Sequence, residues 1–141
     1  MNPIRTGPRT RFAIAAPLLL AAGGAHAVMP MTPQLDAASR AALVRSLAEA
    51  GIPEAGSSAV LISLTSVLGT GPAARRHRYR QPYPQLPDVD ARAQPGQAGC
   101  ANVRLEARPK AEPRRRVAIT GTYCLSDPAR YIWTARALSV R

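Results

Sequence analysis

Cys100 and Cys124 are the two residues whose type and spacing most directly imply a chemistry, the formation of a disulfide. Each lies in a stretch that alternates polar with apolar residues, over 100–108 and 117–124, and the segment between these stretches contains prolines. The alternation predicts two antiparallel strands joined by a structural bridge. A labile redox bond is the alternative, because two cysteines opposed across a hairpin can be strained.

The pairing register of this hairpin follows from placing Cys100 opposite Cys124. A shift of one residue would turn every side chain to the other face, so the register is a strict test. One face is then polar, and the other carries Ala101, Val103, Leu105, Ala107, Val117, Ile119, Gly121 and Tyr123. Arg108 would oppose Arg116, so we expect the ladder to end before this pair. A bridge closing such a loop stabilises a fold by roughly 3 kcal/mol.

A third strand is predicted over 131–140, after the turn signal Ser126-Asp127-Pro128. Its Trp133 would lie over the apolar face of the hairpin. We interpret Trp133 and Tyr123 as large side chains that fill the core, and a ligand-binding platform is the alternative for this lone tryptophan.

Two arginine clusters are candidate anion-binding sites. The chain has 19 basic and 8 acidic residues, a formal net charge of +11. A field of that sign attracts phosphate-bearing lipid head groups, lipopolysaccharide, acidic glycans or nucleic acid. Tyr79 and Tyr83 lie near the first cluster and could stack on bases or grip glycans, although nucleic acid is the partner we expect least. The alternative is solvated charge in an arginine-rich composition. The clusters are Arg75, Arg76, Arg78 and Arg80, and Arg114, Arg115 and Arg116.

No catalytic constellation is apparent in the sequence. His77 lies in the first arginine cluster without a plausible base or ligand beside it, and a metal site needs several converging ligands. Asp88 and Asp90 lie on a proline-rich stretch, where an acid of raised pKa would lack apolar shelter. We therefore infer no metal, cofactor or small-molecule substrate, and we do not expect an enzyme.

Two helices are expected before the hairpin. The first opens at Thr32-Pro33, where a capping hydroxyl precedes a proline, and ends at Gly51-Ile52-Pro53. The second covers 57–68, where apolar residues recur with helical spacing, although β-branched residues leave a strand as the alternative. The two would form an αα-hairpin that covers a small sheet or binds a partner.

Residues 70–99 are interpreted as a flexible basic linker. Prolines, glycines and arginines leave few apolar side chains to offset the entropy cost of ordering this stretch. The predicted fold class is therefore α+β, with an N-terminal αα-hairpin, a disordered Pro/Arg-rich linker and a small disulfide-stapled antiparallel sheet of about three strands. The corresponding segments are 28–69, 70–99 and 100–141.

Residues 1–27 have the three-part layout of a secretory signal peptide, with arginines, an apolar run and the small-residue ending Ala25-His26-Ala27. Cleavage is predicted after Ala27. A retained membrane anchor is the alternative, although the apolar run is about half as long as a spanning helix. No cysteine follows for lipid attachment, so we expect an exported protein in the periplasm or associated with the outer membrane.

One further pattern combines Cys100, a polar strand, Gly121-Thr122-Tyr123-Cys124, a turn with Asp127, and Trp133. This order resembles the C-terminal domain of the bacterial 17 kDa surface antigen family over residues 100–133. The resemblance implies a small exported protein associated with the outer membrane, and it brings no catalytic residues. The family often has a lipid-attachment cysteine and a glycine-zipper segment, and neither is visible in this chain.

We therefore expect an exported, non-enzymatic cell-envelope protein with a structural or binding role. Its expected partners are the outer membrane, lipopolysaccharide or another envelope protein. A periplasmic binder of anionic polymers, acting through the two arginine clusters, is the alternative, and an inhibitor of a cell-wall enzyme is a more remote one. The sequence does not indicate an oligomeric state.

Overall fold

The computed structural model describes residues 32–141. The signal peptide predicted for residues 1–27 lies outside the described residues. The elements are, in chain order, β1 (Gln34–Leu35), α1 (Ala37–Glu49), α2 (Glu54–Leu68), β2 (Arg75–Tyr79), β3 (Asp88–Pro95), β4 (Cys100–Arg108), β5 (Val117–Asp127) and β6 (Ile132–Val140). Within residues 32–141, neither helix is long and apolar enough to cross a membrane.

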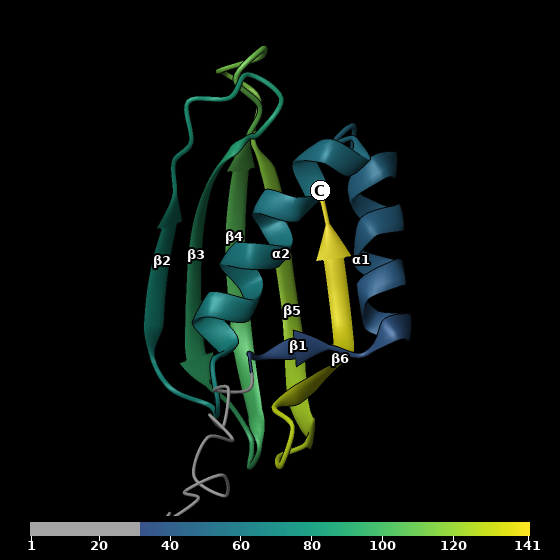
Figure 1. Cartoon of the computed structure of the whole chain (residues 1–141), viewed down its shortest axis with the longest axis vertical. Coiled ribbons are helices and arrows are strands. Elements are labelled where there is room, and N and C mark those ends of the chain that lie inside the picture. The colour runs from purple at the N-terminus through teal and green to yellow at the C-terminus, as the bar shows by residue number, and fades with distance from the viewer. Residues whose placement is uncertain (1–31) are drawn as a thin grey trace, which may run out of the picture. The chain divides into compact units, whose positions relative to one another are not determined.

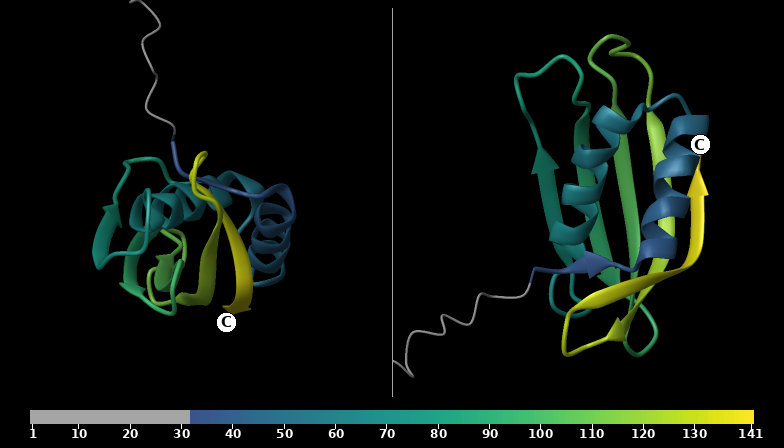
Figure 2. Two further views of the ribbon diagram at one scale, coloured as in Figure 1. Left: turned by 90° about the horizontal axis from the view of Figure 1, so that it is seen from below. Right: turned by 45° about the vertical axis from the view of Figure 1, so that its right-hand side comes forward.

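All six strands form one sheet with the order β1-β6-β5-β4-β3-β2 (Figure 1). β1 is parallel to β6, and the other pairs are antiparallel. Both helices cover the same face of the sheet (Figure 2). α2 contacts β2, β3 and β4, whereas α1 contacts β6 and α2. No element within residues 32–141 covers the opposite face, which we call the open face.

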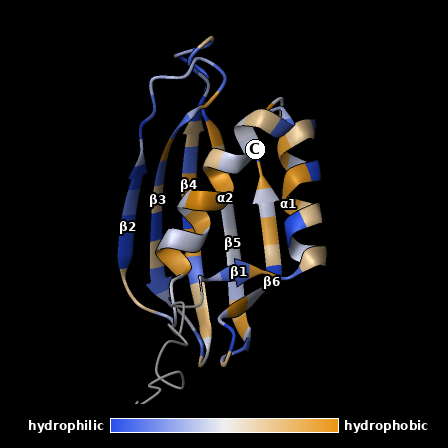
Figure 3. Cartoon of the chain, in the orientation of Figure 1, coloured by the Kyte–Doolittle hydropathy of each residue, from blue (hydrophilic) through white to orange (hydrophobic). Residues whose placement is uncertain are grey.

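The core lies between the helices and the sheet. Buried and accessible residues alternate along β3 and β4, so the strands turn apolar side chains to the helices and polar ones to the open face. Figure 3 colours the ribbon of each strand by the hydropathy of its residues, and both hydrophobic and hydrophilic positions occur along them. Trp133 and Tyr123 are the largest fully buried side chains. α2 contributes Val60 and Leu64 to the same core, since residues four apart lie on one helical face.

The end of α2 is held by two side chains, one from β6 near the C-terminus and one from β2, the strand that follows the helix. The Trp133 indole Nε1 donates a hydrogen bond to the carbonyl of Gly69 at 2.9 Å. The Arg75 guanidinium donates to the carbonyls of Leu68 at 2.7 Å and Gly71 at 2.6 Å. These bonds satisfy carbonyls that a helix terminus otherwise leaves unpaired. They also fix the point where β2 begins.

The predicted hairpin register is confirmed. Cys100 pairs with Cys124, Arg104 with Thr120 and Leu105 with Ile119. The ladder ends at Ala107 and Val117, before Arg108 and Arg116 would meet. The predicted disulfide is present between the two cysteines.

The predicted fold class is wrong in the size of the sheet and in the linker. The sheet has six strands instead of about three, because residues 70–99 contain β2 and β3. Val89, Ala91 and Ala93 are buried at every second position, a strand pattern that is weak in the sequence because two of the three residues are alanines. Pro82, Pro84 and Pro87 lie in the β2–β3 connection, where a missing backbone donor costs little.

The N-terminal αα-hairpin also requires correction. Residues 57–68 belong to a helix, α2, as predicted, and both helices cover the sheet, but they do not form an N-terminal hairpin, because β1 precedes them and joins the six-stranded sheet. α1 does not begin at Thr32-Pro33. Its N-cap is Asp36, whose carboxylate accepts a hydrogen bond from the Ser39 N–H at 2.7 Å, and the two residues before Asp36 form β1.

Candidate anion-binding site

Three arginines form a row across the open face. Arg76 on β2 is the register partner of Arg92 on β3, and Arg92 is the register partner of Arg104 on β4. All three side chains are exposed. Directly paired residues of antiparallel strands share one face and lie about 5 Å apart. We call Arg76, Arg92 and Arg104 the arginine row.

The arginine row has no salt bridge within residues 32–141, although acidic residues lie close by on the same strands. Those acids are already paired. Asp90 binds Arg80 at 3.0 Å and Arg78 at 3.5 Å. Glu106 binds Arg108 at 2.7 Å and Arg116 at 3.7 Å, and Asp88 lies 3.9 Å from Lys110. No carboxylate among the described residues therefore forms an ion pair with the row.

The open face is hollowed at the arginine row. A depression of about 470 Å³ is lined by all three members of the row, together with Arg78, Arg108, Asp90 and Glu106 among others. The guanidinium group is planar, permanently charged and able to donate two parallel hydrogen bonds to a carboxylate or phosphate. The depression therefore has the shape and the chemistry to bind an oxyanion.

Neutral hydrogen-bonding residues continue the arginine row and lie along one side of it. Thr120 on β5 continues it beyond Arg104, and Ser139 on β6 is the register partner of Thr120. The next row along the strands holds Gln94, Asn102 and Thr122, which are also register partners. Hydroxyl and amide groups both donate and accept hydrogen bonds. The site thus combines the arginine row at β2–β4 with neutral polar groups toward β5 and β6, where the exposed Arg136 of β6 also lines a hollow with Asn102 and Thr122.

The structure divides the first predicted arginine cluster between three environments. Arg75 binds the carbonyls at the end of α2 and faces the helix-covered side. Arg76 belongs to the arginine row. Arg78 and Arg80 both form salt bridges with Asp90, so their positive charge is partly compensated. Alternation along β2 separates Arg75 from Arg76 and Arg78, because successive side chains of a strand point to opposite faces. Arg76 and Arg78 share the open face and differ in their register partners on β3, which are Arg92 and Asp90.

The second predicted cluster lies in and beside the β4–β5 loop. Arg115 donates to the carbonyl of Ala50 and pairs with Glu112 at 3.2 Å, so it ties this loop to the end of α1. Arg116 pairs with Glu106. Arg114 is exposed. The structure therefore does not bring the two clusters together into one site.

Arg92 and Arg104 were absent from the clusters predicted from sequence. Neither has a basic neighbour in the chain, so a search for consecutive arginines passes over both. The signal that could have found Arg92 is the alternation of buried Val89, Ala91 and Ala93 with polar residues. That pattern places Arg92 on the polar face of a strand, and the β3–β4 register then brings it beside Arg104.

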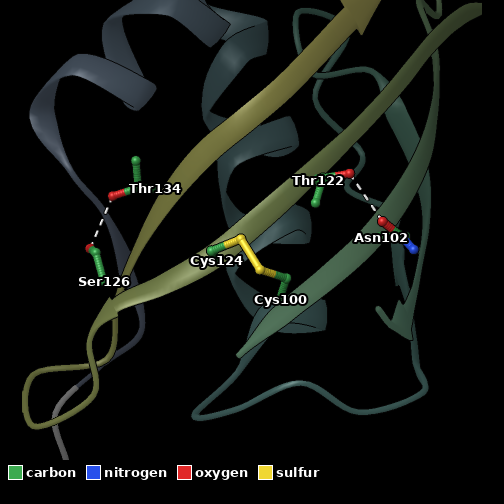
Figure 4. Close-up of a disulfide and its surroundings, with 6 residues drawn as sticks. All are labelled: Cys100, Asn102, Thr122, Cys124, Ser126 and Thr134. Carbon is green, nitrogen blue, oxygen red and sulfur yellow. Dashed lines mark hydrogen bonds between the residues drawn. A yellow bond between two sulfur atoms is a disulfide. The ribbon is translucent and has the colours of Figure 1, made fainter. Parts of the chain in front are cut away.

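The disulfide lies on the open face between β4 and β5 (Figure 4). The Cys100 N–H donates to the carbonyl of Gln97 at 2.8 Å, and its carbonyl accepts from the Gly96 N–H at 2.9 Å. Both groups are thus directed away from β5, and the cysteines form the close, non-hydrogen-bonded type of pair, with Cα atoms 3.9 Å apart. A stable disulfide indicates an environment outside the cytoplasm.

The remaining side chains that could take part in a reaction lie in surroundings typical of structural residues. Burial raises the pKa of Tyr123 to about 12, so its hydroxyl stays protonated in the core. The Nδ1 atom of His77 is buried without a hydrogen-bond partner. Within the described part of the chain, no group of three or more His, Cys, Asp or Glu side chains is placed to hold a metal ion.

A second depression, of about 240 Å³, lies where the α1–α2 turn meets the β2–β3 and β4–β5 loops. Its walls include Ile52, Pro87 and Pro109. The basic residues at its edge are engaged in holding the loops: Lys110 donates to the carbonyls of Gln81 and Tyr83. We assign this depression to loop packing.

Comparisons with protein-family models, with curated proteins and with solved structures found no match to this chain. The resemblance of residues 100–133 to the 17 kDa surface antigen family therefore stays a prediction.

Proposed function

We propose that this chain is an exported, non-enzymatic cell-envelope protein that binds an anionic polymer on the open face of its sheet. The observation that carries the proposal is the arginine row. Like charges placed directly opposite each other destabilise a sheet, and carboxylates of the described residues do not neutralise these three. A bound polyanion would supply the missing counter-charge.

Two features support a location in the cell envelope. The disulfide between Cys100 and Cys124 is typical of proteins outside the cytoplasm. The sequence before residue 28 predicts export. In the periplasm or at the outer membrane, the available polyanions include lipopolysaccharide and acidic glycans.

A binding role suits the chemistry of the open face better than a catalytic one. Guanidinium groups remain protonated at physiological pH and do not serve as general acids or bases. Among the described residues beside the row, Asp90 and Glu106 are held in salt bridges and the Nδ1 atom of His77 is buried, so no free base adjoins these hydroxyl and amide groups to activate a nucleophile. The face can therefore hold an anionic ligand without transforming it.

The proposal is tested by two variants that remove the same charge from different places. Arg76→Gln/Arg92→Gln/Arg104→Gln neutralises the arginine row. Arg40→Gln/Arg45→Gln/Arg114→Gln removes three exposed arginines elsewhere and serves as the control. Binding to lipopolysaccharide and to an immobilised acidic polysaccharide is measured at a series of salt concentrations.

The row variant should lose most of its binding to at least one of these polymers. Its plot of log affinity against log salt should become shallower by about 2 to 3, because three ion contacts disappear. The control should bind nearly as wild type. Equal losses in both variants would show that net charge alone governs binding, and either that result or an unaffected row variant would refute the proposal. Fluorescence of Trp133, the single tryptophan, reports whether each variant is folded.

A further inference from the structure

We infer that the ligand of the open face is a linear acidic polysaccharide that lies across the strands, along the arginine row. The inference rests on the proposed function and adds the class of the ligand and its direction. The supporting observations are the residues that neighbour each arginine on its own strand and on the adjacent strands.

The direction follows from the neighbours of the arginine row. Along β3, the nearest residues to Arg92 on the open face are Asp90 and Gln94, two positions away on either side. Along β4, the corresponding neighbours of Arg104 are Asn102 and Glu106. A polyanion that followed a strand would therefore pass from an arginine to a carboxylate or an amide.

A polyanion that crosses the strands meets a different series of groups. Adjacent strands are about 4.8 Å apart, so the three arginines extend over roughly 10 Å at right angles to the strands. No acidic residue interrupts this path between Arg76 and Arg104, because the three are consecutive register partners. The path thus matches a chain whose acidic groups recur at about the spacing of the strands.

The class of ligand follows from the neutral groups beside the charge. Thr120 and Ser139 extend the arginine row over two further strands, and Gln94, Asn102 and Thr122 form a parallel row. These groups pair with hydroxyls as well as with anions. An acidic polysaccharide presents both kinds of group along its length, and a simple polyphosphate does not.

Aromatic residues are lacking where a nucleic acid would need them. Tyr123 and Trp133 are fully buried in the core. Tyr79 packs against that core, Tyr83 lies in the β2–β3 connection and Tyr131 in the β5–β6 turn. Among residues 32–141, none of these rings lies on the open face, and stacking on aromatic rings is a main source of affinity for unpaired bases.

The test uses oligogalacturonates of increasing length, which carry one carboxylate per sugar, with binding measured by calorimetry at low salt. Wild-type affinity should rise until an oligomer spans the arginine row and then level off. Fully methyl-esterified oligomers, which lack the charge, should not bind detectably. Single-stranded DNA and vesicles of anionic lipid are measured under the same conditions.

Two charge-conserving variants test the direction. Arg92→Gln/Gln94→Arg moves a guanidinium two residues along β3, out of the row but on the same face. Loss of one charge-assisted contact should weaken binding by about tenfold or more. Arg104→Thr/Thr120→Arg moves a guanidinium across to β5 within the row, and it should retain most of the affinity.

The results separate this inference from the proposed function. If the Arg92→Gln/Gln94→Arg protein binds as wild type, or if both variants lose equally, a linear ligand along the row is refuted, whereas a diffuse basic face that binds polyanions still stands. Tighter binding of DNA or lipid vesicles than of the oligosaccharides would refute the ligand class. The proposed function itself fails if neutralising the whole row leaves binding of every polyanion unchanged, or weakens it no more than the Arg40→Gln/Arg45→Gln/Arg114→Gln control does. Thermal unfolding of each variant checks that it is folded. Arg104→Asn/Asn102→Arg moves a guanidinium out of the row on β4 and so repeats the test that Arg92→Gln/Gln94→Arg makes on β3.

Discussion

Arg92 and Arg104 are register partners on β3 and β4, and both side chains are exposed on the open face without a salt bridge to any described residue. Arg76 on β2 is likewise a register partner of Arg92, on the side away from Arg104. Repulsion between such neighbours lowers the stability of the free protein. The arrangement therefore links the stability of the sheet to the presence of anions.

Replacing Arg92 by threonine should stabilise the protein in the absence of ligand. The change removes two like-charge contacts, and threonine suits a strand, so the free energy of unfolding should rise by about 0.5 kcal/mol at low ionic strength. The gain should shrink in high salt, which screens exposed charges. Urea denaturation at two salt concentrations provides the measurement. If the variant is less stable than wild type at both salt concentrations, repulsion within the row is contradicted.

Arg75 and Arg76 are adjacent in the chain, but substitution of Arg75 should lower stability, whereas substitution of Arg76 should weaken binding. Arg75→Gln removes hydrogen bonds to the carbonyls that end α2, so it should lower the free energy of unfolding by about 1 to 3 kcal/mol. Arg76→Gln should change stability by less than about 0.5 kcal/mol but weaken binding of polyanions. Parallel denaturation and binding measurements test the pair. Similar effects of the two substitutions would contradict the assignment of their side chains to opposite faces.

The disulfide should contribute stability without being needed for the fold. Replacing both cysteines by serine should cost about 3 kcal/mol, because the bridge restricts the unfolded chain. The register of β4 and β5 is also fixed by the strands on either side, so the variant should keep its secondary structure at low temperature. Circular dichroism and denaturation of oxidised, reduced and substituted protein provide the comparison. Two titratable thiols in the native protein, purified without reductant, would show that the bridge does not form.

Asp36 should make stability depend on pH in the acid range. Hydrogen bonds from Ser39 and from the hydroxyl of Thr134 hold the pKa of its carboxyl below the ordinary value of 3.8. A lowered pKa in the folded state means that the contribution is complete above pH 3.8 and is lost as the pH falls below it. Asp36→Ala should therefore cost about 1 kcal/mol at neutral pH, the usual value for a lost helix cap. The difference from wild type should narrow below pH 3.8, and a constant difference throughout the acid range would contradict the assignment.

The sequence predicts the centre of the sheet but not its extent. The alternation around Cys100 and Cys124 is strong because each strand carries branched or aromatic residues such as Val103, Ile119 and Tyr123. The disulfide then allows a single pairing register between the two strands. The same alternation in β3 uses alanines, whose small apolar surface barely distinguishes a strand from a linker. β2 contains no aliphatic residue, so its place in the sheet depends on pairing with β3. Long-range pairing of this kind leaves little trace in local sequence.

The candidate site could not be predicted for a related reason. Consecutive arginines such as Arg75 and Arg76 attract attention, yet the strand directs them to opposite faces. Arg92 and Arg104 are twelve positions apart in the chain and meet only through the β3–β4 register. An anion-binding surface on a sheet is built across strands, so its members share a register and not a stretch of sequence.

Chemical footprinting of arginines tests the central claim most directly. The protein is treated with phenylglyoxal, with and without a saturating acidic oligosaccharide, and the modification of each arginine is quantified by mass spectrometry. Arg76, Arg92 and Arg104 should be protected by the ligand, whereas Arg40 and Arg45 on α1 should react equally in both samples. Protection confined to arginines outside the row, or equal protection across the whole surface, would contradict a binding site on the open face.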